Sequence, residues 1–177
     1  MAHGRKIAVT GGIACGKSAV TDFLRRRGVA VVDADEIVHE LIPVEERRRL
    51  AKKVFSDPAA RRELESRVHP VVKRRIRRFF DENADGVAVA AVPLLFEAGW
   101  DGEYDAVCTV VSSEENQIAR MMSCRGYSRE EAESRMAAQM PVAEKAARSH
   151  YVIVNDGSMA ELEREAEKFL DWLRSSL

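Results

Sequence analysis

The sequence has few cysteines, almost no net charge and no long apolar run. Its three cysteines, Cys15, Cys108 and Cys124, are odd in number and lack the spacing of metal ligands, so neither a disulfide framework nor a zinc module is expected. The net charge of −1 gives the molecule as a whole no attraction for nucleic acid or acidic membranes. With no visible signal peptide or membrane-length segment, we expect a protein of the reducing cytoplasm.

Repeats, linkers and low-complexity segments are also missing. The chain has 177 residues, of which 46% are hydrophobic, and this suits one α/β domain with a modest accessory lobe. Cys108 lies in an apolar run and is expected in the core.

A glycine-rich segment near the start of the chain carries the clearest signal. Residues 11–18 read GGIACGKS and match the P-loop pattern G-x-x-x-x-G-K-[ST]. An apolar run before it predicts a buried strand, and apolar residues at helical spacing after it predict a helix. Glycines let backbone N–H groups converge on phosphate oxygens, and the helix N-terminus adds positive potential. An incidental strand–helix turn is the alternative, but it does not account for four fixed positions in this context.

A nucleoside triphosphate is therefore expected to bind here. Lys17 would reach the β- and γ-phosphates, and the Ser18 hydroxyl would take one position on Mg²⁺. The expected ATP-binding residues of this segment are Gly12, Ile13, Ala14, Cys15, Gly16, Lys17, Ser18 and Ala19.

Four further apolar runs predict strands, at residues 29–32, 87–92, 106–111 and 151–154. Helical patterns alternate with them, which is typical of a parallel sheet covered on both faces. Residues 36–85 are too long for a simple crossover, so we interpret them as an inserted substrate lobe. The prediction is an α/β P-loop NTPase fold with a five-stranded parallel sheet. It forms a single kinase domain over residues 1–177, with a core at about 1–35 and 86–177, a helical acceptor lobe at about 36–85 and a lid at about 120–130.

Polar residues predict where helices begin and end. Residues 35–54 are helical in pattern, with an interruption near Pro43. Asp57 before Pro58 predicts a helix start, and that helix should run towards Phe80 with a notch at Pro70, because proline removes a helix hydrogen bond. Residues 81–86 are expected to form a loop. Capping boxes are expected at Ser112 with Glu115, Ser128 with Glu131, and Ser158 with Glu161.

Two carboxylates, Asp33 and Asp35, follow the second expected strand. Ligands of α/β sheets bind beyond the carboxyl ends of the strands, so both are expected near the phosphates. A carboxylate there accepts the proton of an attacking hydroxyl or helps to hold Mg²⁺. Asp35 is our first choice for the base. Capping of the next helix is the alternative role, and it suits at least one of the pair.

Arg120 and Arg125 flank a short turn between two expected helices. Such a hairpin can close over phosphates and bring arginine to developing charge, while a solvated helix surface is the alternative. The basic residues 73–78 are either a solvated face or contacts to a phosphorylated substrate. His69 is either a ligand or a packing histidine. The loop at 155–158 meets an adenine edge through its backbone, caps the last helix through Ser158, or does both.

Motifs in order along nearly the whole chain resemble those of the dephospho-CoA kinase family. They are TGGI at 10–13, VDAD at 32–35, VFSDP at 54–58, HP at 69–70, VPLLFE at 92–97, RMAAQM at 135–140 and YVIVN at 151–155. The resemblance implies transfer of the ATP γ-phosphate to the ribose 3′-hydroxyl of dephospho-CoA, giving CoA and ADP with Mg²⁺. We expect a cytoplasmic monomer with these small-molecule substrates and without nucleic-acid or membrane partners.

The resemblance also implies roles for individual residues. Asp33 and Asp35 would lie at the acceptor hydroxyl and the metal, with Lys17 and Arg125 completing the catalytic set. Arg120 and Asn155 would bind ATP, with Asn155 by the adenine. The acceptor site would be formed by Thr10, Asp33, His69, Pro93, Leu94 and Leu95.

The sequence departs from the family pattern in two places. Leu41 and Ile42 pass almost directly into residues 43–46, so a segment of the helical lobe that family members usually have before the FSDP motif is missing. Ala14 and Cys15 replace the commoner Gly-Ser, and Val154 replaces a usual aspartate. None of these three carries chemistry in our assignment, so we expect activity to survive.

Three other functions fit parts of the sequence. A nucleoside monophosphate kinase would use the same P-loop, lid and insert, and only the VPLLFE and HP resemblances oppose it. A GTP-dependent switch normally needs D-x-x-G and N-K-x-D, and neither occurs. An inactive relative kept as a binding module is opposed by the retention of Lys17, Ser18, Asp33, Asp35 and the lid arginines.

Overall fold

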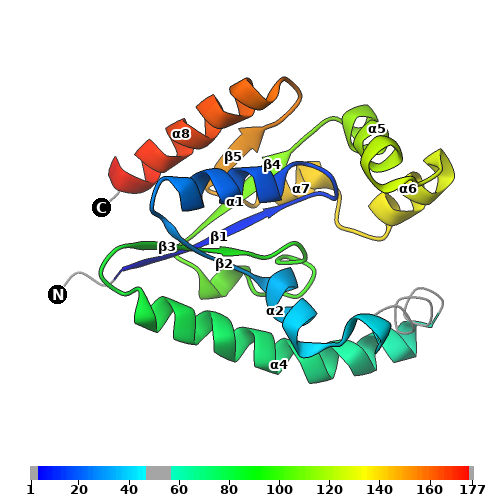
Figure 1. Ribbon diagram of the computed structural model, residues 1–177, viewed down its shortest axis with the longest axis horizontal. Helices are drawn as coiled ribbons and strands as arrows, with labels where there is room; N and C mark the ends of the chain where they lie inside the picture. Colours follow the sequence, from blue (N-terminus) through cyan, green and yellow to red (C-terminus); the bar gives the residue numbers. More distant parts are fainter. Residues whose placement is uncertain (1–3, 47–56, 176–177) are drawn as a thin grey trace.

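The computed structural model describes residues 4–46 and 57–175 (Figure 1). Their strands form one all-parallel sheet in the order β2-β3-β1-β4-β5. The strands are β1 Arg5–Gly11, β2 Ala30–Asp33, β3 Val87–Ala91, β4 Ala106–Val111 and β5 Tyr151–Val154. All five predicted strands and the P-loop NTPase fold class are confirmed. Residues 47–54 of the expected second helical stretch, and residues 54–56 of the VFSDP motif, lie outside the described residues.

The sheet is covered by helices on both faces, and this explains why its strands are mostly apolar. Helices α1 (Lys17–Arg26) and α8 (Met159–Ser175) lie on one face, and α2 (Ala34–Leu41) and α4 (Pro58–Glu82) on the other (Figure 1). Successive side chains of β1 point to opposite faces. Ile7 and Val9 therefore pack in the α1–α8 core, whereas Ala8 packs with Ile76 in the α4 core. Cys108 is buried in the core, as predicted.

Beyond the carboxyl edge of the sheet, α5 (Glu114–Arg125) and α6 (Arg129–Ala137) form a helical hairpin. Ile118, Met121 and Ala132 make its small core, which also touches the P-loop residues Ile13 and Ala14. Helix α7 (Val142–Ala147) follows and packs on β4. None of the described helices is both long and apolar enough to cross a membrane.

Most of the predicted helix caps are present. The Asp57 carboxylate accepts from the backbone N–H groups of Ala59 and Ala60, and Ser128 with Glu131 forms a capping box. Ser158 and Glu161 exchange the same pair of hydrogen bonds. The prediction for Ser112 is wrong, because Ser113 caps α5 by accepting from the Asn116 N–H. Ser112 is buried instead, and its hydroxyl donates to the Asn155 carbonyl oxygen.

Helix α4 runs without a break through Pro70, so the expected notch is wrong. Proline removes one helix hydrogen bond, whereas Val72, Ile76 and Phe80 bury the following turns against the sheet. The helix ends at Glu82 rather than Phe80, so the predicted loop begins two residues later than expected.

Candidate active site

The P-loop connects β1 to α1 at the carboxyl edge of the sheet. Gly16 has φ +97°, and a Cβ there would lie 2.2 Å from the Asn155 Nδ2, so this position requires glycine. A cavity of about 390 Å³, which we call the P-loop cavity, opens above it. Its lining residues are Gly11, Gly12, Ile13, Ala14, Gly16, Lys17, Ser18, Asp35, Pro93, Arg120, Cys124, Arg125 and Gln139.

Two residues of the predicted set lie outside the lining of this cavity. Ala19 is in the first turn of α1, and Cys15 is fully buried beneath the loop. Burial raises the pKa of the Cys15 thiol to about 11, so the thiol stays protonated and unreactive at neutral pH. The role of Cys15 is to fill space under the loop.

Asn155 and Arg120 support the P-loop from below. The Asn155 amide Nδ2 donates to the Cys15 carbonyl oxygen at 2.8 Å. Arg120 donates to the Ala14 carbonyl oxygen at 3.2 Å and to the Asn155 carbonyl oxygen at 2.8 Å. These bonds turn two loop carbonyl groups towards the protein, and in a phosphate-binding loop the anion is held by the opposite, N–H side of the backbone. The family resemblance predicted that both residues bind ATP, but the sequence did not indicate that they also hold the loop in place.

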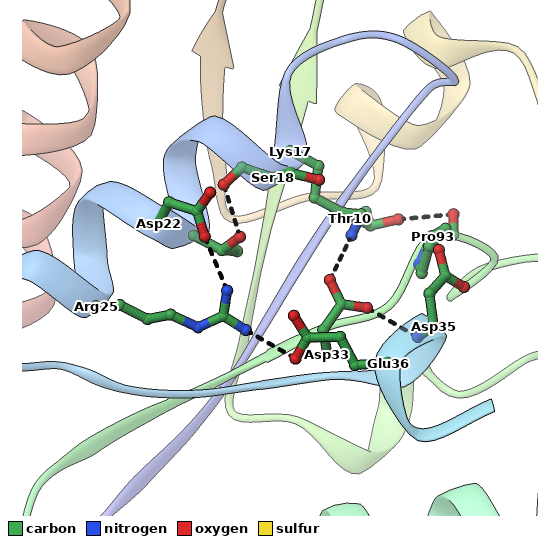
Figure 2. A network of polar contacts seen from close by, with 10 residues as sticks. Thr10, Lys17, Ser18, Asp22, Arg25, Asp33, Asp35, Glu36 and Pro93 are labelled. Carbon is green, nitrogen blue, oxygen red and sulfur yellow. Dashed lines mark hydrogen bonds and ion pairs between the residues drawn. The ribbon is translucent and has the colours of Figure 1, made fainter. Parts of the chain in front are cut away.

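Lys17, which lines the P-loop cavity, pairs with Asp33, which lies outside that lining, with 3.2 Å between Nζ and Oδ2 (Figure 2). The other oxygen of Asp33 accepts from the Asp35 backbone N–H at 2.8 Å and caps α2. The capping role that was left open therefore belongs to Asp33.

The Asp35 side chain faces the P-loop cavity and lies beside Pro93 (Figure 2). Partial desolvation by the surrounding protein raises the pKa of its carboxyl; Lys17 opposes the rise and Asp33 adds to it. A carboxylate with a raised pKa is a better proton acceptor, and this suits a general base.

A second cavity, of about 200 Å³, lies between α2, α4 and the loop after β3, and we call it the α4 cavity. Its lining residues are Ala34, Asp35, Val38, Ile42, Leu64, Glu65, Val68, His69, Val72, Val92, Pro93, Leu94, Ala98 and Trp100. Asp35 and Pro93 line both cavities. The two spaces therefore meet at a carboxylate.

Three residues predicted at the acceptor behave differently from one another. His69 lines the α4 cavity, its ring packs edge-on to Trp100 at 4.9 Å, and desolvation lowers its pKa, so it is neutral at pH 7. Thr10 is buried, and its hydroxyl donates to the Pro93 carbonyl oxygen at 3.1 Å (Figure 2). Leu95 is fully buried in the α4 core and lines neither cavity.

The structure adds Gln139, for which the sequence predicted no role. It follows α6, lines the P-loop cavity, and its Oε1 accepts from the Ile13 N–H at 3.2 Å. The RMAAQM segment was noted as a motif, but 126 residues separate this donor and acceptor along the chain. Arg125 ends α5, is exposed, and lines the same cavity.

Comparison with known proteins agrees with this geometry. The fold and P-loop place the chain in the class of P-loop kinases, and a shikimate kinase from Bacteroides thetaiotaomicron shares the fold, with a TM-score of 0.56 at 17% identity over 96% of this chain and 98% of that one. The dephospho-CoA kinase family model matches residues 5–46 and 44–161. The chain belongs to the dephospho-CoA kinase family.

Relatives match over most of their length. Dephospho-CoA kinases from Symbiobacterium thermophilum and Geobacter sulfurreducens are 41% and 39% identical, each over 92% of this chain and over 79% and 95% of their own lengths. A crystal structure of a Thermus thermophilus protein superposes with a TM-score of 0.81 at 36% identity, covering 97% of this chain and 98% of that one. The family match is split at residues 44–46, close to the place where a segment of the helical lobe is expected to be missing.

Proposed function

We propose that this chain transfers the γ-phosphate of ATP to the 3′-hydroxyl of dephospho-CoA, giving CoA and ADP. The observation that carries the proposal is the meeting of the P-loop cavity and the α4 cavity at Asp35 and Pro93. A phosphate donor in the first space and a hydroxyl acceptor in the second would approach each other beside the Asp35 carboxylate.

In this proposal the residues divide the work by position. The P-loop N–H groups and Lys17 hold the β- and γ-phosphates, so the ammonium leaves Asp33 when ATP binds. Asp35 accepts the proton of the 3′-hydroxyl as its oxygen attacks phosphorus. Arg125, exposed on the rim of the P-loop cavity, approaches the charge that develops on the transferred group.

The lining of the α4 cavity favours an alcohol acceptor. It is mostly apolar, and the described residues that line it include neither arginine nor lysine. A nucleoside monophosphate that placed its reacting phosphate here would meet no cation among those lining residues. A ribose hydroxyl is uncharged and needs only a proton acceptor, which Asp35 supplies. We therefore favour dephospho-CoA over the nucleoside monophosphate alternative.

The proposal includes Mg²⁺, and the residues present fit it. Ser18 lies at the start of α1 and Asp35 opposite, and both line the P-loop cavity with the hard oxygen donors that Mg²⁺ prefers. Such a site normally uses one or two protein oxygens together with substrate phosphates, so a larger protein cage is not required. When bound, the ion would offset the charge of the phosphate oxygens.

We also propose that the protein acts as a monomer in the cytoplasm without a nucleic-acid partner. The three cysteines are free thiols, which suits a reducing compartment. Light scattering under turnover conditions measures the molar mass of the protein and so tests whether it is a monomer.

The decisive experiment measures Mg²⁺-dependent ADP release with dephospho-CoA, with a panel of nucleoside monophosphates, and without acceptor. Dephospho-CoA-dependent turnover with CoA as product supports the proposal. Turnover only with a monophosphate would contradict it, and nucleotide binding without turnover would indicate an inactive relative.

A further inference from the structure

We propose that Gln139 binds the γ-phosphate of the nucleotide through its Nε2 amide, and thereby acts as a catalytic residue. This inference rests on the proposed transfer from ATP and deepens it. Three observations support it: the orientation of the amide, the anchoring of its backbone, and the position of the side chain in the P-loop cavity.

The orientation of the amide follows from its partner. The Ile13 backbone N–H is a donor, so the atom that meets it at 3.2 Å must be the carbonyl oxygen of Gln139. The amide NH₂ group then points away from that bond. Among the described residues, none accepts a hydrogen bond from this NH₂ group, although the side chain is half-buried and lines the P-loop cavity. Gln139 also lines an adjoining space of about 420 Å³ beside α6 and α7, so its pair of donors is available where these two spaces adjoin.

The backbone that carries Gln139 is tied to the body of the protein. The N–H of the next residue, Met140, donates to the Glu97 carboxylate at 3.0 Å. Glu97 in turn pairs with Lys145 at 2.8 Å, and Lys145 is fully buried. The Lys145 ammonium also donates to the Pro93 carbonyl oxygen at 3.0 Å. Gln139 is therefore fixed relative to Pro93, where the two cavities meet, and its donors are oriented before substrate binds.

The chemistry needs only what the proposed reaction already supplies. The acceptor oxygen forms a bond to the γ-phosphorus, the bond from that phosphorus to the bridging oxygen of ADP breaks, and the hydroxyl proton passes to Asp35. Charge is spread over the equatorial oxygens of the transferred group in the transition state. Lys17 and Arg125 supply positive charge from the P-loop and from α5, and Gln139 adds neutral donors from the side of Ile13 and Pro93. Loss of one such donor typically costs about 10²–10³ in kcat.

Two substitutions separate the effect of the Gln139 NH₂ donors from that of the Gln139 oxygen, which supports the loop at Ile13. Gln139→Glu retains an oxygen for the Ile13 N–H but has no NH₂ donor, and Gln139→Ala removes both without adding charge. The matched control is Ala138→Glu, which adds the same charge at the preceding residue, where the side chain is exposed at the end of α6.

The measurements are kcat and the dissociation constants of ADP and of a non-hydrolysable ATP analogue. The ratio of these two constants isolates contacts to the γ-phosphate, because damage to the P-loop affects both ligands. We expect both Gln139 variants to lower kcat about 100-fold and to shift the ratio about tenfold against the analogue, and Ala138→Glu to change neither more than about twofold.

Three results would overturn the inference: kcat retained in Gln139→Glu, an equal loss of ADP and analogue affinity in both variants, or a shifted ratio in Gln139→Glu but not in Gln139→Ala. The binding ratio needs no acceptor, so it tests Gln139 even if dephospho-CoA proves not to be the substrate. Failure of the proposed function would show instead as wild-type analogue binding without dephospho-CoA turnover.

Discussion

Lys17 and Asp33 form an ion pair in which each side chain is only about a tenth exposed, at 12% and 10%. In the proposed function the same ammonium binds the phosphates, so ATP and the Asp33 carboxylate compete for it. Asp33 also caps α2, which places the pair at the junction of the P-loop and the helix that carries Asp35. We therefore expect nucleotide binding to exchange one anionic partner of Lys17 for another.

Replacement of Asp33 tests this exchange. Asp33→Asn keeps an oxygen for the Asp35 N–H and so keeps the cap, but it removes the charge of the carboxylate that pairs directly with the mostly buried Lys17 ammonium. We expect the free energy of unfolding without nucleotide to fall by about 1–3 kcal/mol. Thermal unfolding with excess ADP should recover most of that loss, because phosphate replaces the carboxylate. Asp22→Asn, which breaks an exposed pair with Arg25, should cost no more than about 1 kcal/mol with or without ADP.

Replacement of Asp35 tests the general base. Asp35→Asn should lower kcat about 10²–10⁴-fold while leaving the affinity for ADP, measured without Mg²⁺, nearly unchanged. Because the pKa of Asp35 is raised, the acid limb of the wild-type kcat/KM profile should lie above the ordinary range of an aspartate. A near-normal kcat in this variant would transfer the role to Asp33 or show that no base is required.

The raised pKa of Asp35 also affects stability. A carboxyl whose pKa is higher in the folded chain than in the unfolded chain binds its proton more tightly when folded, so stability falls as pH rises through that interval. Asp35→Asn removes the loss. We expect the variant to melt at a higher temperature than wild type at pH 7, with the difference disappearing below the ordinary pKa of aspartate. A pH series of melting curves checks the sign.

The backbone of Ala14, in the P-loop, has a positive φ of +58°, a conformation that favours glycine. This conformation costs an alanine about 1–2 kcal/mol, and glycine adopts it freely. Ala14→Gly should therefore raise the free energy of unfolding by about 1 kcal/mol, less the added entropy of the unfolded chain. The matched control is Ala119→Gly in the exposed middle of α5, where glycine should lower stability by about 1 kcal/mol. Denaturant titrations of both variants should give opposite signs.

Replacement of Lys145 tests the buried contacts with Glu97 and Pro93 that hold the backbone next to Gln139. Lys145→Met leaves Glu97 and the Pro93 carbonyl without their charged partner, and it should lower the free energy of unfolding by about 3 kcal/mol. Lys168→Met removes an ion pair with Glu165 whose lysine is 66% exposed, so the same substitution there should cost at most about 1 kcal/mol. Equal losses in the two variants would contradict a structural role for the buried pair.

Local patterns were sufficient for most of the fold. Apolar runs identified the strands because a strand buried on both faces has few polar side chains, and the P-loop was identified because its backbone requires glycine at Gly16. The patterns failed at Pro70 and Ser112. At Pro70, burial of the following turns outweighs one lost hydrogen bond, and at Ser112 a neighbouring serine caps the helix while Ser112 reaches β5.

The sequence by itself determined the phosphate-binding loop, the parallel sheet and the pair of aspartates beyond its second strand, because each depends on neighbouring residues in the chain. Tertiary structure alone decided what those side chains do. In the folded chain Asp33 caps α2 and pairs with Lys17, and Asp35 lines both cavities. Leu95 is buried, and Gln139 accepts a hydrogen bond from Ile13. These outcomes depend on which residues, far apart along the chain, lie together at the carboxyl edge of the sheet. A local sequence pattern does not predict such long-range neighbours.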